Sequence, residues 1–245
     1  MKKIFALLVL ALVPVLACAE EEGPPLEQAP VNLGDKASLQ HGAAIFINNC
    51  LNCHSASLMR YKKLEDLGLS EKQIKDNLLF TTDKIGGNMS VPVDPKISKA
   101  AFGVVPPDLS LIARSRSADW LYTYLRSFYR DAKSNSGWNN TVFPNVAMPN
   151  VLWHQQGEQA LQVTERTNDI TGDKIETRKL VLERPGAMSR IEFDRYVGDL
   201  VNYLVYMSEP AQTDRKQWGV VVLFFLAGFF VLAFLLKKEY WKDVR

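Results

Sequence analysis

Apolar side chains recur at helical spacing in three long stretches of the chain. Ser38–Asn49 reads as a helix in which Gly42 and Phe46, four residues apart, share one face. Ser117–Tyr129 carries aromatic and leucine side chains at helical intervals, and Ile191–Glu209 repeats that pattern before a proline ends it. The pattern therefore predicts a mainly α-helical domain.

Shorter stretches connect these helices. Ser70–Asn77 predicts a short helix, because Ser70 and Gln73 have the spacing of a capping box. Gly86–Pro107 is rich in turn residues, and Gln156–Arg178 is polar and mixed in charge, which favours a solvated hairpin or surface loop with turns at 168–169 and 172–173. We expect helices joined by long loops. Gly42 either lets another helix approach closely, with Phe46 beside it, or is a glycine in an ordinary amphipathic helix.

An uncharged apolar run, Gly219–Leu236, predicts a membrane span near the C-terminus. With Trp218 included, at about 1.5 Å per residue, it covers roughly 28 Å of a ~30 Å hydrocarbon core. A buried helix of a soluble protein would carry a polar stripe, and this run has none. The segment 237–245 after the run carries more basic side chains than the segment just before it. This excess places the tail in the cytoplasm and the large domain outside.

The N-terminus reads as an export signal. Two lysines precede the apolar run Ile4–Ala17, and Ala17-Cys18-Ala19 fits a cleavage site, so residues 1–19 are predicted to be a signal peptide. A second interpretation stays open, in which Cys18 is the acylated N-terminus of a lipoprotein. Residues 20–36 begin acidic and proline-rich and predict a flexible lead-in.

The rest of the chain is long enough for one domain. Of 245 residues, 37–210 would form an exported domain, 211–217 a linker, and 218–236 the transmembrane helix. The formal net charge of +2 includes the leader and the basic tail, so nothing favours a nucleic-acid partner.

Cys50-Leu51-Asn52-Cys53-His54 supplies the candidate chemistry, because Cys-x-x-Cys-His is the spacing that attaches a c-type haem. Two thiols on one side of a helical turn can form thioethers with the haem vinyl groups, and His54 then reaches the iron. A thioredoxin-like redox pair does not need the histidine. A structural zinc site needs four ligands, and His41 and His154 are scattered along the sequence. One motif predicts one haem.

The second axial ligand stays open on these grounds. A methionine ligand would raise the potential and close the site, whereas an open site would permit ligand binding. Met59 is too near His54 to reach the opposite face, and Met207 has ordinary hydrophobic neighbours. Met89 and Met188 remain possible, and Met148 lies in a stiff loop between prolines.

Four groups of residues occur in an order that resembles the cytochrome c1 family. They are Leu39-Gln40-His41-Gly42 leading to the haem motif, Pro106-Pro107-Asp108-Leu109-Ser110 followed by Arg114-Ser115-Arg116, Val146-Ala147-Met148-Pro149, and Ser208-Glu209-Pro210 with Arg215 before the span. The resemblance is to the bacterial form of this haem c subunit of the ubiquinol–cytochrome c reductase (bc1) complex. The stretch 62–99 departs most from the family, and the acidic docking surface of the family is only weakly visible.

The resemblance implies a cytochrome c-like haem domain with one haem c attached through Cys50 and Cys53. It implies His54 and Met148 as the iron ligands and places Arg116 at a haem propionate. It also implies that Pro106 or Pro107 presents a carbonyl to the other nitrogen of His54.

The implied function is electron transfer from the Rieske iron–sulfur subunit to a cytochrome c, within a dimeric complex that also holds cytochrome b. The chain would supply no catalytic acid or base to the oxidoreductase, and would sit in the bacterial inner membrane with its haem domain on the periplasmic side. A free-standing anchored carrier, a haem subunit of another respiratory enzyme, and a haem enzyme or gas sensor with an open iron site remain alternatives.

Overall fold

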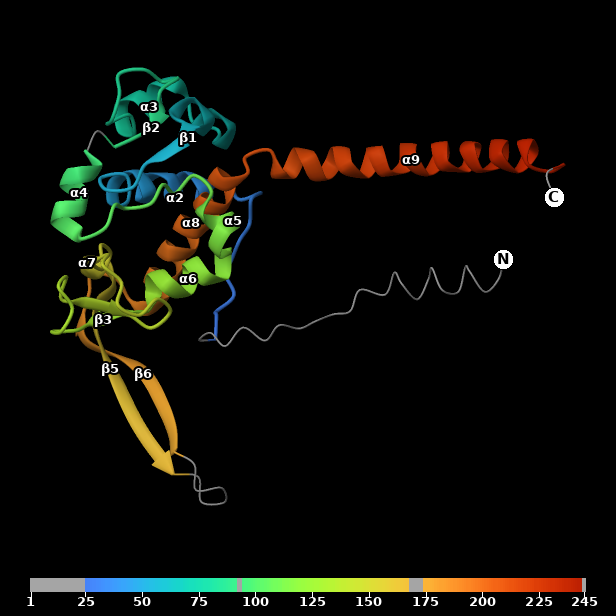
Figure 1. Ribbon diagram of the computed structural model, residues 1–245. Helices are drawn as coiled ribbons and strands as arrows, with labels where there is room; N and C mark the ends of the chain where they lie inside the picture. The colour runs from blue at the N-terminus through green and yellow to red at the C-terminus, as the bar shows by residue number, and fades with distance from the viewer. Residues whose placement is uncertain (1–24, 92–93, 168–173, 244–245) are drawn as a thin grey trace.

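A computed structural model describes residues 25–91, 94–167 and 174–243. The predicted signal peptide 1–19 with Cys18, residues 20–24 of the lead-in and the end of the tail lie outside these ranges. Three helices form the centre of the domain (Figure 1): α2 (Lys36–Asn49), α6 (Ala118–Arg126) and α8 (Arg190–Ser208). The other elements are β1 (Ala56–Arg60), the 3-10 helix η1 (Tyr61–Leu67), α3 (Glu71–Asn77), β2 (Asn88–Met89), α4 (Pro95–Phe102), α5 (Ile112–Arg116), β3 (Phe128–Arg130), β4 (Trp138–Asn140), α7 (Trp153–Gln156), β5 (Gly157–Thr167), β6 (Lys174–Pro185) and α9 (Gln212–Tyr240).

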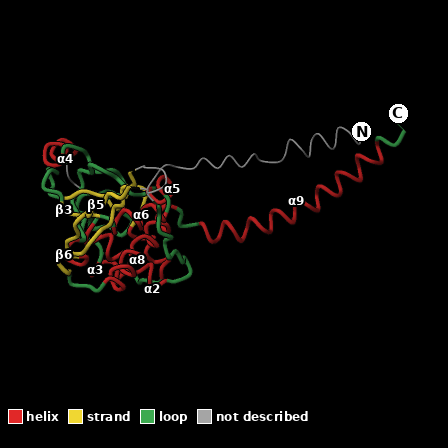
Figure 2. Tube along the Cα trace, turned by 90° about the horizontal axis from the view of Figure 1, so that it is seen from below, coloured by secondary structure: helices red, strands yellow, loops and turns green. Residues whose placement is uncertain are grey.

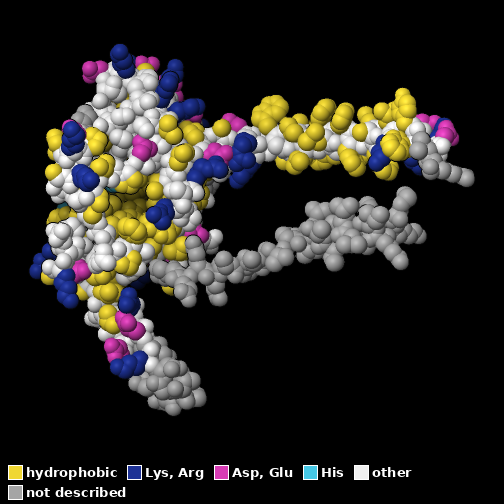
Figure 3. Space-filling model, in the orientation of Figure 1, with side chains coloured by type: hydrophobic (Ala, Val, Ile, Leu, Met, Phe, Trp, Pro, Cys, Tyr) yellow, Lys and Arg dark blue, Asp and Glu magenta, His cyan; other side chains and the backbone are white. Residues whose placement is uncertain are grey.

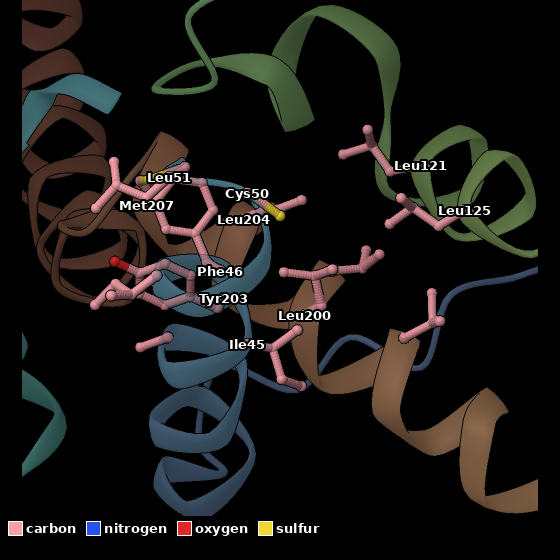
Figure 4. Close-up of a cluster of buried hydrophobic side chains, with 14 of the residues drawn as sticks. Ile45, Phe46, Cys50, Leu51, Leu121, Leu125, Leu200, Tyr203, Leu204 and Met207 are labelled. Atoms are coloured by element: carbon pink, nitrogen blue, oxygen red, sulfur yellow. The ribbon is translucent and has the colours of Figure 1, made fainter. Parts of the chain in front are cut away.

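The first and last helices of the domain, α2 and α8, cross at Gly42. A Cβ atom at this position would lie 2.0 Å from the carbonyl oxygen of Asp199, so only glycine permits the approach. The rings of Phe46 and Tyr203 pack beside the crossing with centroids 5.7 Å apart. The close-approach interpretation of Gly42 is therefore confirmed. Figure 4 shows the surrounding core, in which side chains of α2, α6 and α8 meet.

Helix α6 ends earlier than its periodicity predicts. The side chain of Ser117 caps its start by accepting a hydrogen bond from the backbone nitrogen of Trp120. At the other end, Asn140 donates to the carbonyl oxygen of Tyr124 at 2.8 Å and takes the place of a further helical turn. Residues 128–130 leave the helix and pair antiparallel with β4, so the predicted extension to Tyr129 is wrong.

Capping explains where several other helices begin. The capping box of Ser70 and Gln73 is present at α3, as predicted, and Ser189 and Glu192 form a second one at α8. Helix α4 was not predicted within the loop-rich stretch. Its signals are local, with Asp94 as N-cap and Gly103 in the left-handed conformation after its end.

The described part of the lead-in, from residue 25 onward, lies against the domain and makes hydrogen bonds to it. The backbone nitrogen of Glu27 donates to the hydroxyl of Thr123 at 2.8 Å, and the backbone nitrogen of Ala29 donates to the carboxylate of Asp119 at 2.8 Å. Both acceptors belong to α6. The backbone nitrogen of Asn32 donates to Asn202 of α8 at 3.0 Å. Side chains far along the sequence thus hold a segment whose composition favours disorder.

The polar stretch after α7 is a long antiparallel hairpin of β5 and β6 (Figure 1), which is one of the two predicted forms and continues past the predicted end at Arg178 to Pro185. Its strands pair from Gly157 with Pro185 to Thr167 with Lys174 and project away from the helical core. The turn signals at 168–169 and 172–173 lie outside the described residues.

Helix α9 is long and apolar enough to cross a membrane, and among the described residues it is the one helix that is. It leaves the domain as a single rod (Figure 2). The predicted linker 211–217 is wrong as a separate connection, because α9 already begins at Gln212. Pro210 precedes the helix rather than interrupting it, and the polar residues that follow contain no helix breaker.

Candidate haem site

The cysteine motif lies in the turn that follows α2. The backbone nitrogens of Cys53 and His54 both donate to the carbonyl oxygen of Cys50, at 3.0 and 2.9 Å, and this continues the helical path for one turn. Both thiols are free; Cys50 is buried and Cys53 is exposed. Burial, with a smaller effect of Cys53, raises the pKa of the Cys50 thiol to about 12. In the folded chain this thiol is therefore protonated at neutral pH.

His54 is oriented by one backbone carbonyl. Its Nδ1 lies 2.8 Å from the carbonyl oxygen of Pro107. A carbonyl only accepts hydrogen bonds, so Nδ1 carries the hydrogen and Nε2 keeps a lone pair for a metal. Burial lowers the pKa of His54 and outweighs the Pro107 carbonyl and the Asp108 charge, which both raise it. The ring is therefore neutral at pH 7. The expected carbonyl contact is present, and Pro107 provides it.

The Pro107 carbonyl is held in place by bonds between the segments 55–58 and 107–110. The backbone nitrogen of Leu109 donates to the carbonyl oxygen of Ser55 at 2.8 Å. The carboxylate of Asp108 accepts from the backbone nitrogens of Ser57 and Ser110, both at 2.8 Å. Partial burial would raise the pKa of Asp108, but the hydrogen bonds from Ser110 and Ser57 outweigh it and the pKa is lowered. Sequence reasoning assigned no role to Asp108.

The five methionines considered as ligands fall into two groups. Met59, Met89 and Met207 are buried in the core, and the Met89 sulfur accepts a hydrogen bond from Tyr203 Oη at 3.6 Å. Met148 and Met188 are half-buried. Met188 lines a separate cavity of about 280 Å³ that also has His41 and Asp199 in its wall.

Met148 lies against the aromatic face of α6. Tyr124 Oη donates to its Sδ at 3.4 Å, and the Tyr124 ring stacks on Trp120 with centroids 4.8 Å apart. Burial raises the pKa of Tyr124, so its hydroxyl keeps its proton and remains a donor. The sequence showed these aromatics as a helical face without indicating that Tyr124 contacts Met148.

Arg116 completes this aromatic group. Its guanidinium carbon lies 5.2 Å from the ring centroid of Trp120 and 6.0 Å from that of Phe143. The side chain is exposed, and no carboxylate lies within ion-pair distance of it among the described residues. It is therefore available to an anionic group.

The surroundings fit a haem better than the alternatives. Figure 3 shows a hollow lined by apolar side chains over α8, between α2 and α6. Cys50, at the end of α2, and Leu121 and Leu125 of α6 border the same part of the core (Figure 4). Two free thiols fit covalent attachment of haem c, and an imidazole with a free Nε2 and a half-buried thioether fit its iron. In the described part of the chain no three His, Cys, Asp or Glu side chains gather as a zinc site would require.

Comparisons with known proteins agree with this geometry. The model of the cytochrome c1 family matches residues 27–173 and 188–244. The chain is 46% identical to cytochrome c1 of Allochromatium vinosum over the whole of both chains. It is 47% identical to the ammonia monooxygenase gamma subunit of Nitrosomonas europaea, over 98% of this chain and 97% of the relative. It is also 27% identical to cytochrome c1 of Rhodospirillum rubrum, over 86% and 83% of the two chains. The ordered motifs, the helical domain with its apolar C-terminal helix and these matches together show that the chain belongs to the cytochrome c1 family of electron-transfer haem proteins.

Proposed function

We propose that this chain is the haem c subunit of a ubiquinol–cytochrome c reductase complex, where it passes single electrons from an iron–sulfur subunit to a cytochrome c. The observation that carries the proposal is the hydrogen bond from His54 to Pro107 directly after the cysteine pair. It fixes the tautomer that leaves Nε2 for iron, which a thioredoxin-like pair would not need. The similarity to a cytochrome c1 along its whole length supports the choice of complex.

Each site residue has a defined part in this proposal. Cys50 and Cys53 hold one haem c by thioethers, and His54 and Met148 are the ligands of its iron. Arg116 pairs with a haem propionate. When bound, haem c supplies a one-electron iron couple. The chain itself orients the imidazole, presents the thioether and surrounds the site with apolar side chains, and no acid or base is required of it.

The anchor defines the place of the domain in the cell. We propose that α9 crosses the bacterial inner membrane once, with the tail 237–245 in the cytoplasm and the haem domain 37–210 in the periplasm. The apolar side chains of α9 are exposed along its length, which fits lipid together with a neighbouring membrane subunit such as cytochrome b. The complex would be dimeric, as the family resemblance implies.

A second candidate is a haem subunit of another membrane enzyme. The similarity to the protein named ammonia monooxygenase gamma subunit favours a monooxygenase complex as that alternative. The haem site and anchor would be the same in both complexes, and the partner subunits would differ.

Purification of the tagged full-length chain from membranes in mild detergent tests the proposal. We expect b-type haem and an iron–sulfur protein to copurify with ubiquinol–cytochrome c reductase activity. Reduced-minus-oxidised spectra and subunit analysis provide the readouts. Copurification with monooxygenase subunits would favour the second candidate, and a chain isolated alone with haem c would be a free-standing anchored carrier.

A further inference from the structure

We propose that the face around the candidate haem site docks an electron acceptor protein whose own surface is acidic. The proposal rests on the proposed electron-transfer function and adds the charge of the partner. Three sets of observations carry it: the charges on the segments around the site, their ion pairs, and the apolar side chains between them.

The segments that surround the site carry an excess of basic side chains. Residues 50–60, 94–116 and 141–154 contain the haem motif, the segment that orients His54 and the Met148 loop. Together they hold five basic side chains, Arg60, Lys96, Lys99, Arg114 and Arg116, against the two acidic ones, Asp94 and Asp108. Figure 3 shows Lys and Arg side chains at both margins of the apolar hollow.

Most of these positive charges are not neutralised within the chain. Among the described residues, ion pairs engage only Arg114 of the five, through Glu209 at 2.6 Å. The carboxylate of Asp108 is turned inward to the backbone nitrogens of Ser57 and Ser110. Even with Arg116 committed to a haem propionate, Lys96 and Lys99 of α4 make no ion pair among the described residues and outnumber the one carboxylate on that helix, Asp94, which accepts from the backbone nitrogen of Lys96 at 2.8 Å.

Large apolar side chains are exposed on the same segments. Five of them are between 43% and 51% exposed: Phe102, Val104, Val105, Leu111 and Phe143. Protein interfaces combine an apolar centre with a charged rim, and the rim steers the encounter through complementary charge. A basic rim therefore selects a partner with an acidic surface around its own cofactor. The acceptor gains one electron and the donor chain loses one, with no bond or proton transferred.

Oxidation of the reduced full-length holoprotein by two protein probes tests the charge of the partner. An acidic plastocyanin and a basic mitochondrial-type cytochrome c are mixed with it in neutral detergent over a range of ionic strength. We expect the rate with plastocyanin at low salt to exceed that with the basic cytochrome by about tenfold or more, and to fall as salt screens the rim. Binding to immobilised plastocyanin, which needs no electron transfer, should weaken with salt in the same way.

Charge reversal on α4 tests the surface. The double variant Lys96→Glu with Lys99→Glu should slow the reaction with plastocyanin about tenfold at low salt and leave it unchanged at high salt. Lys96→Gln with Lys99→Gln, which perturbs α4 less, should give a smaller effect of the same sign. Lys174→Glu with Lys179→Glu on the hairpin is the matched control and should change the rate less than twofold.

Several outcomes separate the failure of this inference from that of the proposed function. If every variant binds haem c and is oxidised by ferricyanide, but the basic cytochrome reacts faster than plastocyanin, the inference is overturned and electron transfer stands. If the α4 variant loses binding to anionic lipid vesicles while its rate with plastocyanin is unchanged, the basic rim serves the membrane instead. If no haem c is found in the wild-type chain, the proposed function itself fails.

Discussion

Among the methionines that the structure describes, Met148 is the one that combines partial exposure with a position against the aromatic face of α6. We predict that Met148→Ala removes the iron's thioether ligand, lowers the reduction potential and abolishes the long-wavelength sulfur-to-iron band of the oxidised protein. Visible spectroscopy and a redox titration of the purified chain measure both effects.

Met188 provides the matched control at the residue scale, because it is also half-buried but lines the cavity beside His41. Met188→Leu should leave the band and the potential unchanged. An unaltered spectrum in Met148→Ala would mean that Met148 is no ligand and would favour the open-site alternative.

At the residue scale, the sequence was sufficient to propose site residues where the chemistry is local in the chain. Cys50, Cys53 and His54 are contiguous, so their spacing could be recognised directly. Tyr124 and Asp108 act on residues distant in sequence, and no periodicity indicates such contacts. Only the resemblance to a family pointed to a carbonyl near residue 107.

The crossing of α2 and α8 provides the clearest prediction at the scale of elements. Gly42→Ala places a Cβ atom 2.0 Å from a backbone oxygen of α8, so the helices must separate. We expect a loss of about 3 kcal/mol in the free energy of unfolding. For a domain of this size the melting temperature should fall by roughly 6–12 °C in detergent.

Gly86→Ala is the control for this crossing, because nothing lies within 4 Å of the added Cβ atom. Its effect should stay within about 0.5 kcal/mol. Equal melting temperatures for the two variants would show that α2 and α8 are not in close contact.

A largely buried arginine side chain joins the lead-in to two helices. Arg126 of α6 is 9% exposed and contacts Glu27 at 2.6 Å and Asp194 of α8 at 2.7 Å. Arg126→Met should destabilise the fold by about 2–4 kcal/mol, because the partly buried Asp194 loses its partner while the more exposed Glu27 regains water. Thermal unfolding measures the loss. Arg178→Met, at an exposed ion pair on the hairpin, should cost less than about 0.5 kcal/mol.

Element boundaries were predicted best where the capping residue lies beside the helix. Ser70 and Gln73 showed where α3 begins, and the periodicity of α8 was correct to one residue at each end. The contacts of the lead-in and the end of α6 were not predicted, for the same physical reason. In both places a side chain from another part of the sequence forms a hydrogen bond with the backbone. Asn202 accepts from the lead-in, and Asn140 donates to the end of α6.

At the scale of the whole molecule, one carboxylate connects the anchor to the domain. Glu209 accepts from Arg114 of α5 at 2.6 Å and from Arg215 of α9 at 2.5 Å. The hydrogen bond from Arg215 lowers the pKa of Glu209 from its ordinary value near 4.5. Slight desolvation opposes this effect, and the charge of Arg114 adds to it. The link is therefore complete above that value and is lost as pH falls through the lowered pKa.

Glu209→Gln should loosen this junction at neutral pH. We expect faster limited proteolysis between the domain and α9, because both arginines lose their charged partner. Lowering the pH below about 4 should accelerate cleavage in the wild type and have little further effect in the variant. A variant with wild-type cleavage at neutral pH would contradict the role of Glu209. Lys63→Gln, at an exposed ion pair on η1, controls for the loss of a surface charge.

The position of Cys50 restricts the order of events during assembly of the protein. Its thiol becomes buried and its pKa rises to about 12 in the fold, and the core around it includes α8, which is synthesised just before the anchor. Since the thiolate is the reactive form, a folded domain would be a poor substrate for thioether formation. If Cys50 holds haem c as proposed, we expect the cofactor to be attached while the chain is still open, before its first and last helices meet.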